Sequence, residues 1–239
     1  MSVISGHDYS YGDKGFEFDF VYGEQGDDEI WGASYVDGKI VLDGGSGDDK
    51  LYAGARNYGA ESFLYGGSGK DIIRTDWFEQ RGGPLSIYGD FYIFGDHKYG
   101  TDALDKDLWG DADEIYNGYG NDYDVEIVAG DGDDLVHTGN EWYYNKVHAG
   151  NGDDTIYLGD GNAYVYAYGD DGDDTIVPKS SYEDVDNGGV YVNNWELIMG
   201  GKGNDLVRGS HGKNYNDGYG FLHGNDGDDK LYGGDESGY

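Results

Sequence analysis

A short acidic, glycine-rich segment recurs nine times along this chain, and an apolar residue follows two positions after the last aspartate of each copy. The clearest copies begin at Gly44, Gly66 and Gly200 and read GGSGDDKLY, GGSGKDIIR and GGKGNDLVR. Self-similarity at a period of about 20 to 22 residues predicts a repeat architecture, in which stacked coils bury one continuous core. The aspartates that end the nine turns are Asp28, Asp49, Asp71, Asp113, Asp134, Asp154, Asp174, Asp205 and Asp229.

Two columns of mostly aliphatic residues keep the same period as the turns. Because side chains in a strand alternate between its two faces, both columns predict the inward ladders of a thin, two-walled solenoid. We therefore expect an all-β, right-handed parallel β-roll of about nine to ten coils, with two strands per coil. The column after the turns is Ile30, Leu51, Ile73, Ile115, Val136, Ile156, Ile176, Val207 and Leu231. The column before the turns is Val21, Leu42, Leu64, Ile87, Ile127, Val147, Ala167, Ile198 and Leu222.

Two longer spacings predict insertions into a single domain that spans residues 1–239. In the first, Gly89-Asp90 is expected to begin a turn that residues 91–109 interrupt and that Asp113 completes. The second insertion is expected at about 178–194. A second row of turns should lie opposite the first. This row is eroded: the copy at 117–122 keeps its acid, Asp122, whereas the copies at 159–163 and 209–214 do not. The pattern thus predicts one full row of ion-binding turns and one eroded row.

The nonapeptide G-G-x-G-x-D-x-U-x, in which U is a large apolar residue, resembles the calcium-binding repeat of the RTX (repeats-in-toxin) β-roll family. The resemblance covers nearly the whole chain, and it implies that Ca²⁺ lies between turns stacked one coil apart. Each turn would give its sixth-position Asp and main-chain oxygens, which are ligands that calcium prefers. Nine turns make up to about eight such sites. The glycines expected to shape them are Gly45, Gly47, Gly67, Gly69, Gly130, Gly132, Gly150, Gly152, Gly172, Gly201, Gly203 and Gly227.

Several turns depart from the consensus. The second glycine is replaced by Glu24, Asp90, Asp170 or Asn225 in four copies. Asp and Asn adopt left-handed backbone more readily than most residues, so those turns are expected to form. Glu24 suits this conformation less well, and the Asp113 turn has Asp111 in place of a glycine. Calcium occupancy is therefore least assured at these two turns.

The formal charge of −34 and pI near 4.1 oppose compaction unless cations compensate, and eight divalent ions would leave about −18. With only 15 Lys and Arg residues, the chain is not expected to bind nucleic acid. No apolar run approaches the length of about 20 residues that a transmembrane helix needs. The start of the chain does not resemble a cleaved signal peptide. The RTX resemblance implies export without one, to the extracellular space or the cell surface.

No enzymatic activity is expected, because the six His residues are scattered and the chain has no Cys. One hypothesis is a structural protein that self-assembles into a filament, sheet or coat through ends that lack helical caps and through an apolar, aromatic outer face. The other is a module that binds polysaccharide on that face, with ice binding as a weaker variant. The outward pairs of this face are expected to be Phe20/Tyr22, Val41/Asp43, Phe63/Tyr65, Ser86/Tyr88, Glu126/Val128, Lys146/His148, Tyr166/Tyr168, Leu197/Met199 and Phe221/His223.

Overall fold

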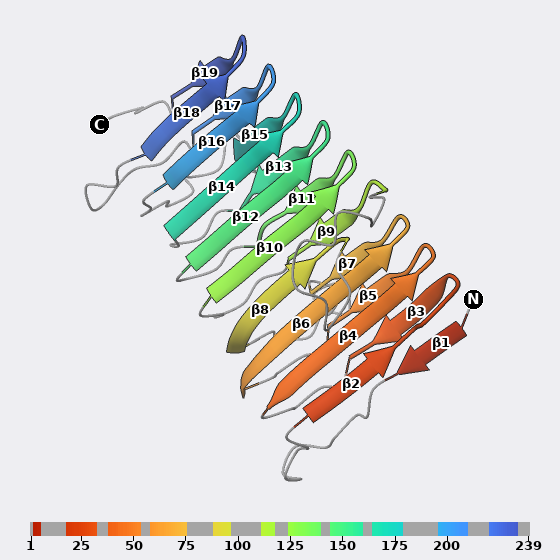
Figure 1. Ribbon diagram of the computed structural model, residues 1–239. Coiled ribbons are helices and arrows are strands. Elements are labelled where there is room, and N and C mark those ends of the chain that lie inside the picture. The colour runs from red at the N-terminus through yellow and green to blue at the C-terminus, as the bar shows by residue number, and fades with distance from the viewer. Residues whose placement is uncertain are drawn as a thin grey trace, which may run out of the picture.

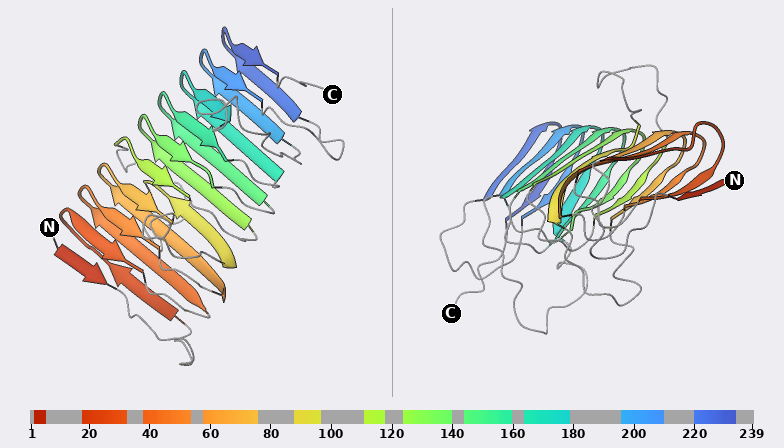
Figure 2. Two further views of the ribbon diagram at one scale, coloured as in Figure 1. Left: turned by 180° about the vertical axis from the view of Figure 1, so that it is seen from behind. Right: turned by 90° about the horizontal axis from the view of Figure 1, so that it is seen from below.

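The computed structural model is an all-β parallel solenoid with two sheets (Figure 1). It describes residues 2–5, 18–32, 38–53, 58–75, 88–96, 111–117, 124–139, 144–159, 164–178, 196–209 and 220–233. All strand pairs within the sheets are parallel, as expected for coils stacked on one another. Figure 2 shows the strands following one another along a single axis, with β1 (Ser2–Ser5) and β19 (Lys230–Tyr232) at opposite ends.

One sheet has nine strands and contains the longer strand of each coil. In order along the solenoid these are β2 (Phe18–Tyr22), β4 (Lys39–Ser46), β6 (Tyr58–Ser68), β8 (Tyr88–Phe94), β10 (Asp124–Asp131), β12 (Tyr144–Asn151), β14 (Tyr164–Asp171), β16 (Glu196–Lys202) and β18 (Gly220–Asp226).

The other sheet has ten short strands. Between β1 and β19 lie β3 (Asp28–Trp31), β5 (Lys50–Tyr52), β7 (Ile72–Arg74), β9 (Glu114–Tyr116), β11 (Leu135–His137), β13 (Thr155–Leu158), β15 (Thr175–Pro178) and β17 (Leu206–Arg208). The tight turns that join a long strand to the following short strand lie along one edge of the stack (Figure 1). The described residues contain no helix that is long and apolar enough to cross a membrane.

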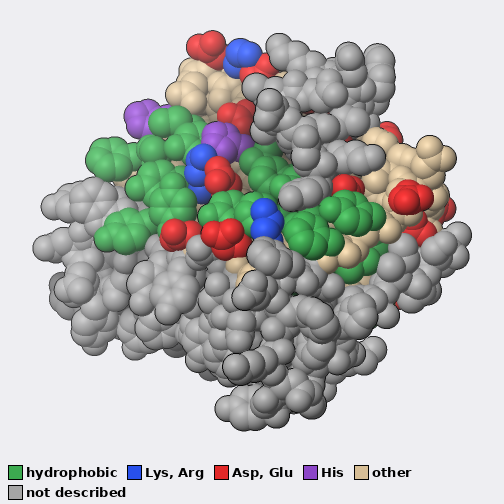
Figure 3. Space-filling view, turned by 60° about the horizontal axis from the view of Figure 1, so that its bottom comes forward, with side chains coloured by type: hydrophobic (Ala, Val, Ile, Leu, Met, Phe, Trp, Pro, Cys, Tyr) green, Lys and Arg blue, Asp and Glu red, His purple; other side chains and the backbone are tan. Residues whose placement is uncertain are grey.

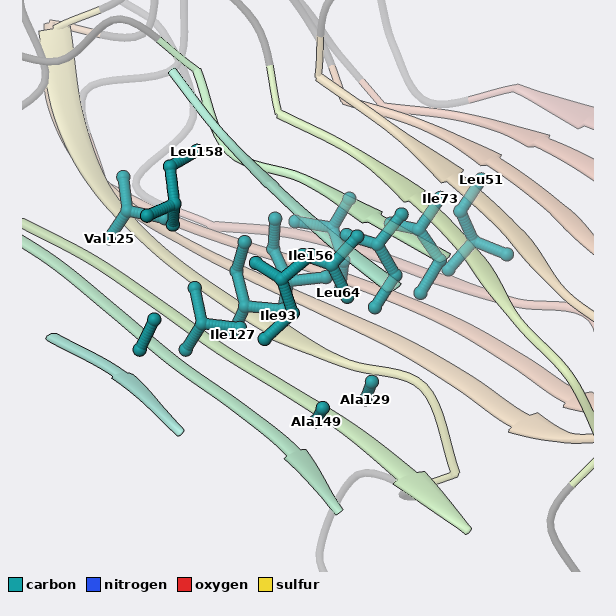
Figure 4. Packing of buried hydrophobic residues seen from close by; sticks show 14 of the residues in the cluster. Leu51, Leu64, Ile73, Ile93, Val125, Ile127, Ala129, Ala149, Ile156 and Leu158 are labelled. Carbon is teal, nitrogen blue, oxygen red and sulfur yellow. The ribbon is translucent and has the colours of Figure 1, made fainter. Parts of the chain in front are cut away.

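The core consists of the two aliphatic columns that the sequence predicts. On the short strands, Ile30 pairs with Leu51 and the ladder continues without a break to Leu231. The members from Ile30 to Val207 are fully buried, because alternating side chains of both sheets meet between the walls (Figure 4). Ala129 and Ala149 lie closest to the turns, where the space between the walls admits only a small side chain.

The entry to the interrupted coil differs from the prediction. Residues 88–94 form β8, and Ile93 pairs with Leu64 on one side and Ile127 on the other. Ile93 therefore takes the core position expected for Ile87, and the expectation that Gly89-Asp90 begins the turn and that the insertion starts at residue 91 is wrong. The turn begins instead at Gly95-Asp96, which lies beside Ala129-Gly130. The second expected insertion, at about 178–194, lies almost wholly outside the described residues.

The outward pair Val41/Asp43 is also different from the prediction, since both side chains are buried. Val41 stands in register between Phe20 and Phe63, and Asp43 stands between Tyr22 and Tyr65. Larger neighbours in the same row shield a short side chain from water. In the interrupted coil, Tyr92 and Phe94 replace the expected pair Ser86/Tyr88.

Candidate metal centre

The nine aspartates of the repeat form one hydrogen-bonded column along the edge of tight turns. The main-chain N–H of each Asp donates to Oδ1 of the Asp one coil further along, over 2.7–3.0 Å in eight successive pairs from Asp28 to Asp229. The side chains from Asp28 to Asp205 are buried. The structure thus brings together all nine residues that the sequence singles out. Asp122 lies outside the described residues, as does most of the eroded second row.

The second oxygen of these carboxylates has a different environment. Among the described residues it has no hydrogen-bond partner in seven members of the column, and it is buried there. A buried carboxylate oxygen without a partner is costly, so the column is suited to a cation. These atoms are Oδ2 of Asp49, Asp71, Asp113, Asp134, Asp154, Asp174 and Asp205.

Main-chain oxygens converge on the same places. A methyl group built on Gly44 would overlap both Asp49 Oδ2 and the carbonyl oxygen of Gly66 in the next coil. The same pairing of a carboxylate oxygen with a carbonyl oxygen recurs at Gly66 and at Gly169. Carboxylate and carbonyl oxygens are the ligands of calcium, whereas zinc prefers nitrogen and sulfur. The donor set of the turns therefore fits calcium.

The column is not a compact cluster of side chains. Among the described residues, no group of three or more His, Cys, Asp or Glu side chains gathers as a metal centre. In each turn the repeat Asp contributes its inner carboxylate, and carbonyl oxygens of the glycine-rich main chain lie near it. An ion held between two turns would draw much of its coordination from carbonyl groups, which calcium's flexible geometry allows.

Burial raises the pKa of the seven inner carboxyl groups of the column, from Asp49 to Asp205, above their usual value of 3.8. The pKa is about 6 for Asp49, about 8 for Asp71 and about 10 for Asp113, mainly because of desolvation. Neighbouring carboxylates of the column raise these values further, and the N–H of the adjacent Asp opposes the shift. A divalent cation beside these groups would favour their charged form.

The turns use the backbone conformation that the glycines predict. All twelve predicted glycines have positive φ, from 100° at Gly45 to 153° at Gly172. Glu24, Asp170 and Asn225 adopt left-handed backbone as well, with φ of 74°, 75° and 76°. Close stacking adds a second constraint, because a Cβ on Gly150 would overlap the carbonyl oxygen of Gly130. These positions therefore need both the freedom and the small size of glycine.

The turn that ends at Asp113, which we call the split turn, is assembled from two separate stretches of chain. Gly95-Asp96 forms its first half, and Asp111-Ala112-Asp113 forms its second half. The first half lies against Ala129-Gly130, and Asp111 lies against Gly132, so both halves contact the same turn of the next coil. The Asp113 N–H still donates to Asp134 Oδ1 over 2.8 Å. The interruption therefore leaves the aspartate column intact.

A second, exposed ladder runs beside the buried column, and our sequence analysis missed it. It uses the residue that precedes each repeat Asp, which is Asp or Asn in seven of nine copies. Its hydrogen bonds run in the opposite direction, since Asp48 N–H donates to Asp27 Oδ1 in the preceding coil over 3.1 Å. The same bond links Asp153 to Asp133 and Asp173 to Asp153. The frequency of Asp and Asn at this position was the available signal.

The comparison with known families agrees with this geometry. The model of the RTX calcium-binding nonapeptide repeat (4 copies) matches residues 5–34, 41–56, 62–78, 117–141, 144–165, 193–220 and 216–237, which together make up more than half of the chain. No curated protein and no solved structure matches the chain.

Proposed function

The chain belongs to the RTX calcium-binding nonapeptide-repeat family, and from this premise we propose that it is a calcium-dependent structural protein that assembles end to end. The observation that carries the proposal is where the exposed apolar side chains lie. Six large hydrophobic side chains are exposed among the described residues, and five of them are on terminal strands. These are Phe20 and Tyr22 on β2, Phe221 on β18, and Leu231 and Tyr232 on β19.

The proposed ligands of calcium are the nine aspartates of the column, together with main-chain oxygens of the glycine-rich turns. Up to about eight ions would lie between successive turns. Bound calcium supplies positive charge and links the turns of neighbouring coils. The Asp side chains accept the N–H groups of the column and present their second oxygens to the ion. We include among the calcium sites the two turns that depart most from the consensus, which end at Asp28 and Asp113. The left-handed φ of Glu24 supports the first, and the contacts of both halves of the split turn support the second.

We also propose the hand of the roll, its number of coils and its organisation as one domain. A right-handed roll of nine to ten coils, forming one domain, is consistent with nine strands in one sheet and ten in the other. Parallel strands joined through a crossover are almost always right-handed, which supports the proposed hand.

The two ends of the roll offer matching surfaces for a second copy of the chain. Among the described residues, no strand pairs with the outer edges of β18 and β19 at one end, or of β2 and β1 at the other. Unpaired strand edges are templates for pairing with another chain. Polar caps usually end such stacks, whereas Leu231 exposes 45% of its surface in a core column whose inner members are fully buried. A head-to-tail contact would bury it and could continue without closing.

The aromatic rings of the outer surface support assembly more than polysaccharide binding. Phe63 stacks on Tyr92 with centroids 4.8 Å apart, and Tyr65 stacks on Phe94 at 5.0 Å. In these pairs the ring faces contact one another, and ring faces are what a sugar would need to stack on. Figure 3 shows hydrophobic side chains side by side on the surface, with charged and His side chains among them. Phe221 pairs with Leu197 on one side, and no described strand lies on its other side, where another copy would stack.

The proposed role is structural, not enzymatic. Repeats of this family are typical of secreted bacterial proteins, which supports an extracellular or surface location. Calcium is plentiful outside cells, so a roll of this acidity would find its counter-ions there.

Sedimentation velocity and negative-stain electron microscopy of the calcium-stripped protein, before and after adding millimolar calcium, test the proposal. We expect ordered polymers only with calcium. Phe221→Lys should block them, because it places a charge on the terminal surface. Tyr164→Lys is the matched control, since Tyr164 is as exposed as Phe221 (51% against 52%) but lies inside the stack.

Monomers at high calcium and high protein concentration would contradict assembly. In that case, retardation of the protein in polysaccharide gels would favour the alternative of a glycan-binding module. Polymers that form equally well with Phe221→Lys would contradict the terminal contact.

A further inference from the structure

Asp96 is a buried carboxylate at the point where the chain leaves the split turn. Only 5% of its surface is exposed. Its Oδ2 accepts the N–H of Asp131 over 2.6 Å, and its Oδ1 is buried without a hydrogen-bond partner among the described residues. In the turn at Glu24, the corresponding N–H, that of Ser46, donates to the main-chain carbonyl of Glu24. The Asp96 side chain therefore occupies the place of a neutral carbonyl oxygen.

The carboxylate of Asp96 points toward the column of repeat aspartates. A methyl group on Gly130, in the next coil, would overlap Asp96 Oδ2. A methyl group on the adjacent Gly95 would overlap Asp113 Oδ2 and the carbonyl oxygen of Ala129. The charge of Asp96 also raises the pKa of Asp71, Asp113 and Asp134, on both sides of the split turn. One coil thus has two inward carboxylates, Asp96 and Asp113.

Asp170 shows that the residue type alone does not create this arrangement. It occupies the same second position of its turn, with a left-handed φ of 75°. Its carboxylate is directed outward, where Oδ2 lies 2.9 Å from Nδ1 of His148, and 40% of the side chain is exposed. Asp96 does not have positive φ. The two aspartates therefore differ in backbone conformation as well as in the direction of the side chain.

We propose that the split turn forms the strongest calcium site of the row, with Asp96 as an additional carboxylate ligand, and that the ion there joins the two halves of the turn. The inference rests on the proposed binding of calcium by the aspartate column. Calcium affinity rises with the number of charged ligands. In the other described turns the carboxylate of the column is that of the repeat Asp, since the buried Asp43 stands in the outer row between Tyr22 and Tyr65. The ion would link Gly95-Asp96 to Asp111–Asp113 and so hold the coils on either side of the interruption together.

Competitive titration with calcium alone, against a calibrated chelator, tests the proposal on the full chain. We expect a tightest site whose affinity falls roughly tenfold in Asp96→Asn, because one ligand charge is lost while its hydrogen-bond acceptor is kept. Asp170→Asn is the matched control. It removes the same charge from the same turn position, and it should leave the tightest site unchanged.

Hydrogen exchange of the unmodified protein gives a second readout that needs no variant. With less than one equivalent of calcium, the amides of 88–96 and 124–135 should gain protection before those of other coils. If Asp96→Asn does not fold, this order of protection decides the question.

The outcomes separate the two proposals. A chain that binds no calcium contradicts the proposed function itself. Calcium binding with equal affinity in Asp96→Asn and Asp170→Asn, or protection that begins in other coils, leaves the proposed function standing and overturns the role of Asp96.

Discussion

Asp48 and Asp49 are neighbours in the sequence, yet they belong to different ladders. Asp49 is fully buried, and its Oδ2 and the carbonyl oxygen of Gly66 lie around the same point beside Gly44. Asp48 is exposed and accepts the N–H of Lys70 over 3.0 Å. Both side chains carry a formal negative charge, but only Asp49 is placed to bind an ion between coils. At the scale of single residues, position in the turn decides the role of each acid.

We expect Asp49→Asn to raise the calcium concentration needed for folding several-fold, because it removes a charged ligand from two adjacent sites. Asp48→Asn should change this concentration little, since an exposed charge is screened by water and salt. Circular dichroism during calcium titration of both variants measures the difference. Equal shifts for the two variants would mean that net charge, not ligation, controls folding.

The column of buried aspartates behaves as one element. Its carboxyl groups stack in successive coils, so neighbouring members of the column raise the pKa of Asp71, Asp113 and Asp154 beyond the effect of desolvation. The folded chain therefore binds protons more tightly than the unfolded chain, whose carboxyl groups titrate near 3.8. In linkage terms, this contribution to stability is present at acid pH and is lost as pH rises through the raised values.

For the calcium-stripped protein, we expect the free energy of unfolding to fall as pH rises from about 4 through about 6 to 10, the range of the pKa values of Asp49 and Asp113. With calcium present, the free energy of unfolding should instead rise as pH rises from acid values, because protons compete with the ion for the carboxylates. Urea unfolding at several pH values measures both profiles. High salt is the control, since it screens general repulsion and should leave the effect of the buried groups.

The whole molecule is long and has a thin core, so each coil depends on its neighbours for burial. Ile156 lies in the middle of the stack and is fully buried, whereas Leu231 in the same column lies at the end and exposes 45% of its surface. Stability therefore varies along the roll mainly through burial and the bound ions.

Ile156→Ala should lower the free energy of unfolding by about 2–5 kcal/mol, because it leaves a cavity between two walls. Leu231→Ala should cost less than about 1 kcal/mol in the monomer, since little of its side chain is buried. Denaturant unfolding at saturating calcium and low protein concentration compares them. A larger cost for Leu231→Ala that appears only at high protein concentration would indicate that assembly buries this residue.

The periodic part of the structure follows from the order of the amino acids alone. Alternation in strands places Ile30 and Leu51 in one column, and a fixed period places Asp49 and Asp71 in another. Glycine, Asp and Asn at the turns indicated left-handed backbone, which the φ values confirm. Such features follow from local stereochemistry repeated at a constant interval, so they need no knowledge of distant contacts. The family of the chain could be identified for the same reason.

The way in which the interrupted coil joins the stack depends on contacts between coils. Ser86-Ile87-Tyr88-Gly89-Asp90 and Tyr92-Ile93-Phe94-Gly95-Asp96 share one pattern six residues apart, and local rules do not choose between them. Stacking of Tyr92 on Phe63 and of Phe94 on Tyr65 favours the second, because two aromatic pairs form across the sheet. That choice also brings Asp96 beside the aspartate column. Contacts between coils, and not the repeat, therefore placed Asp96 as a second buried carboxylate in the split turn.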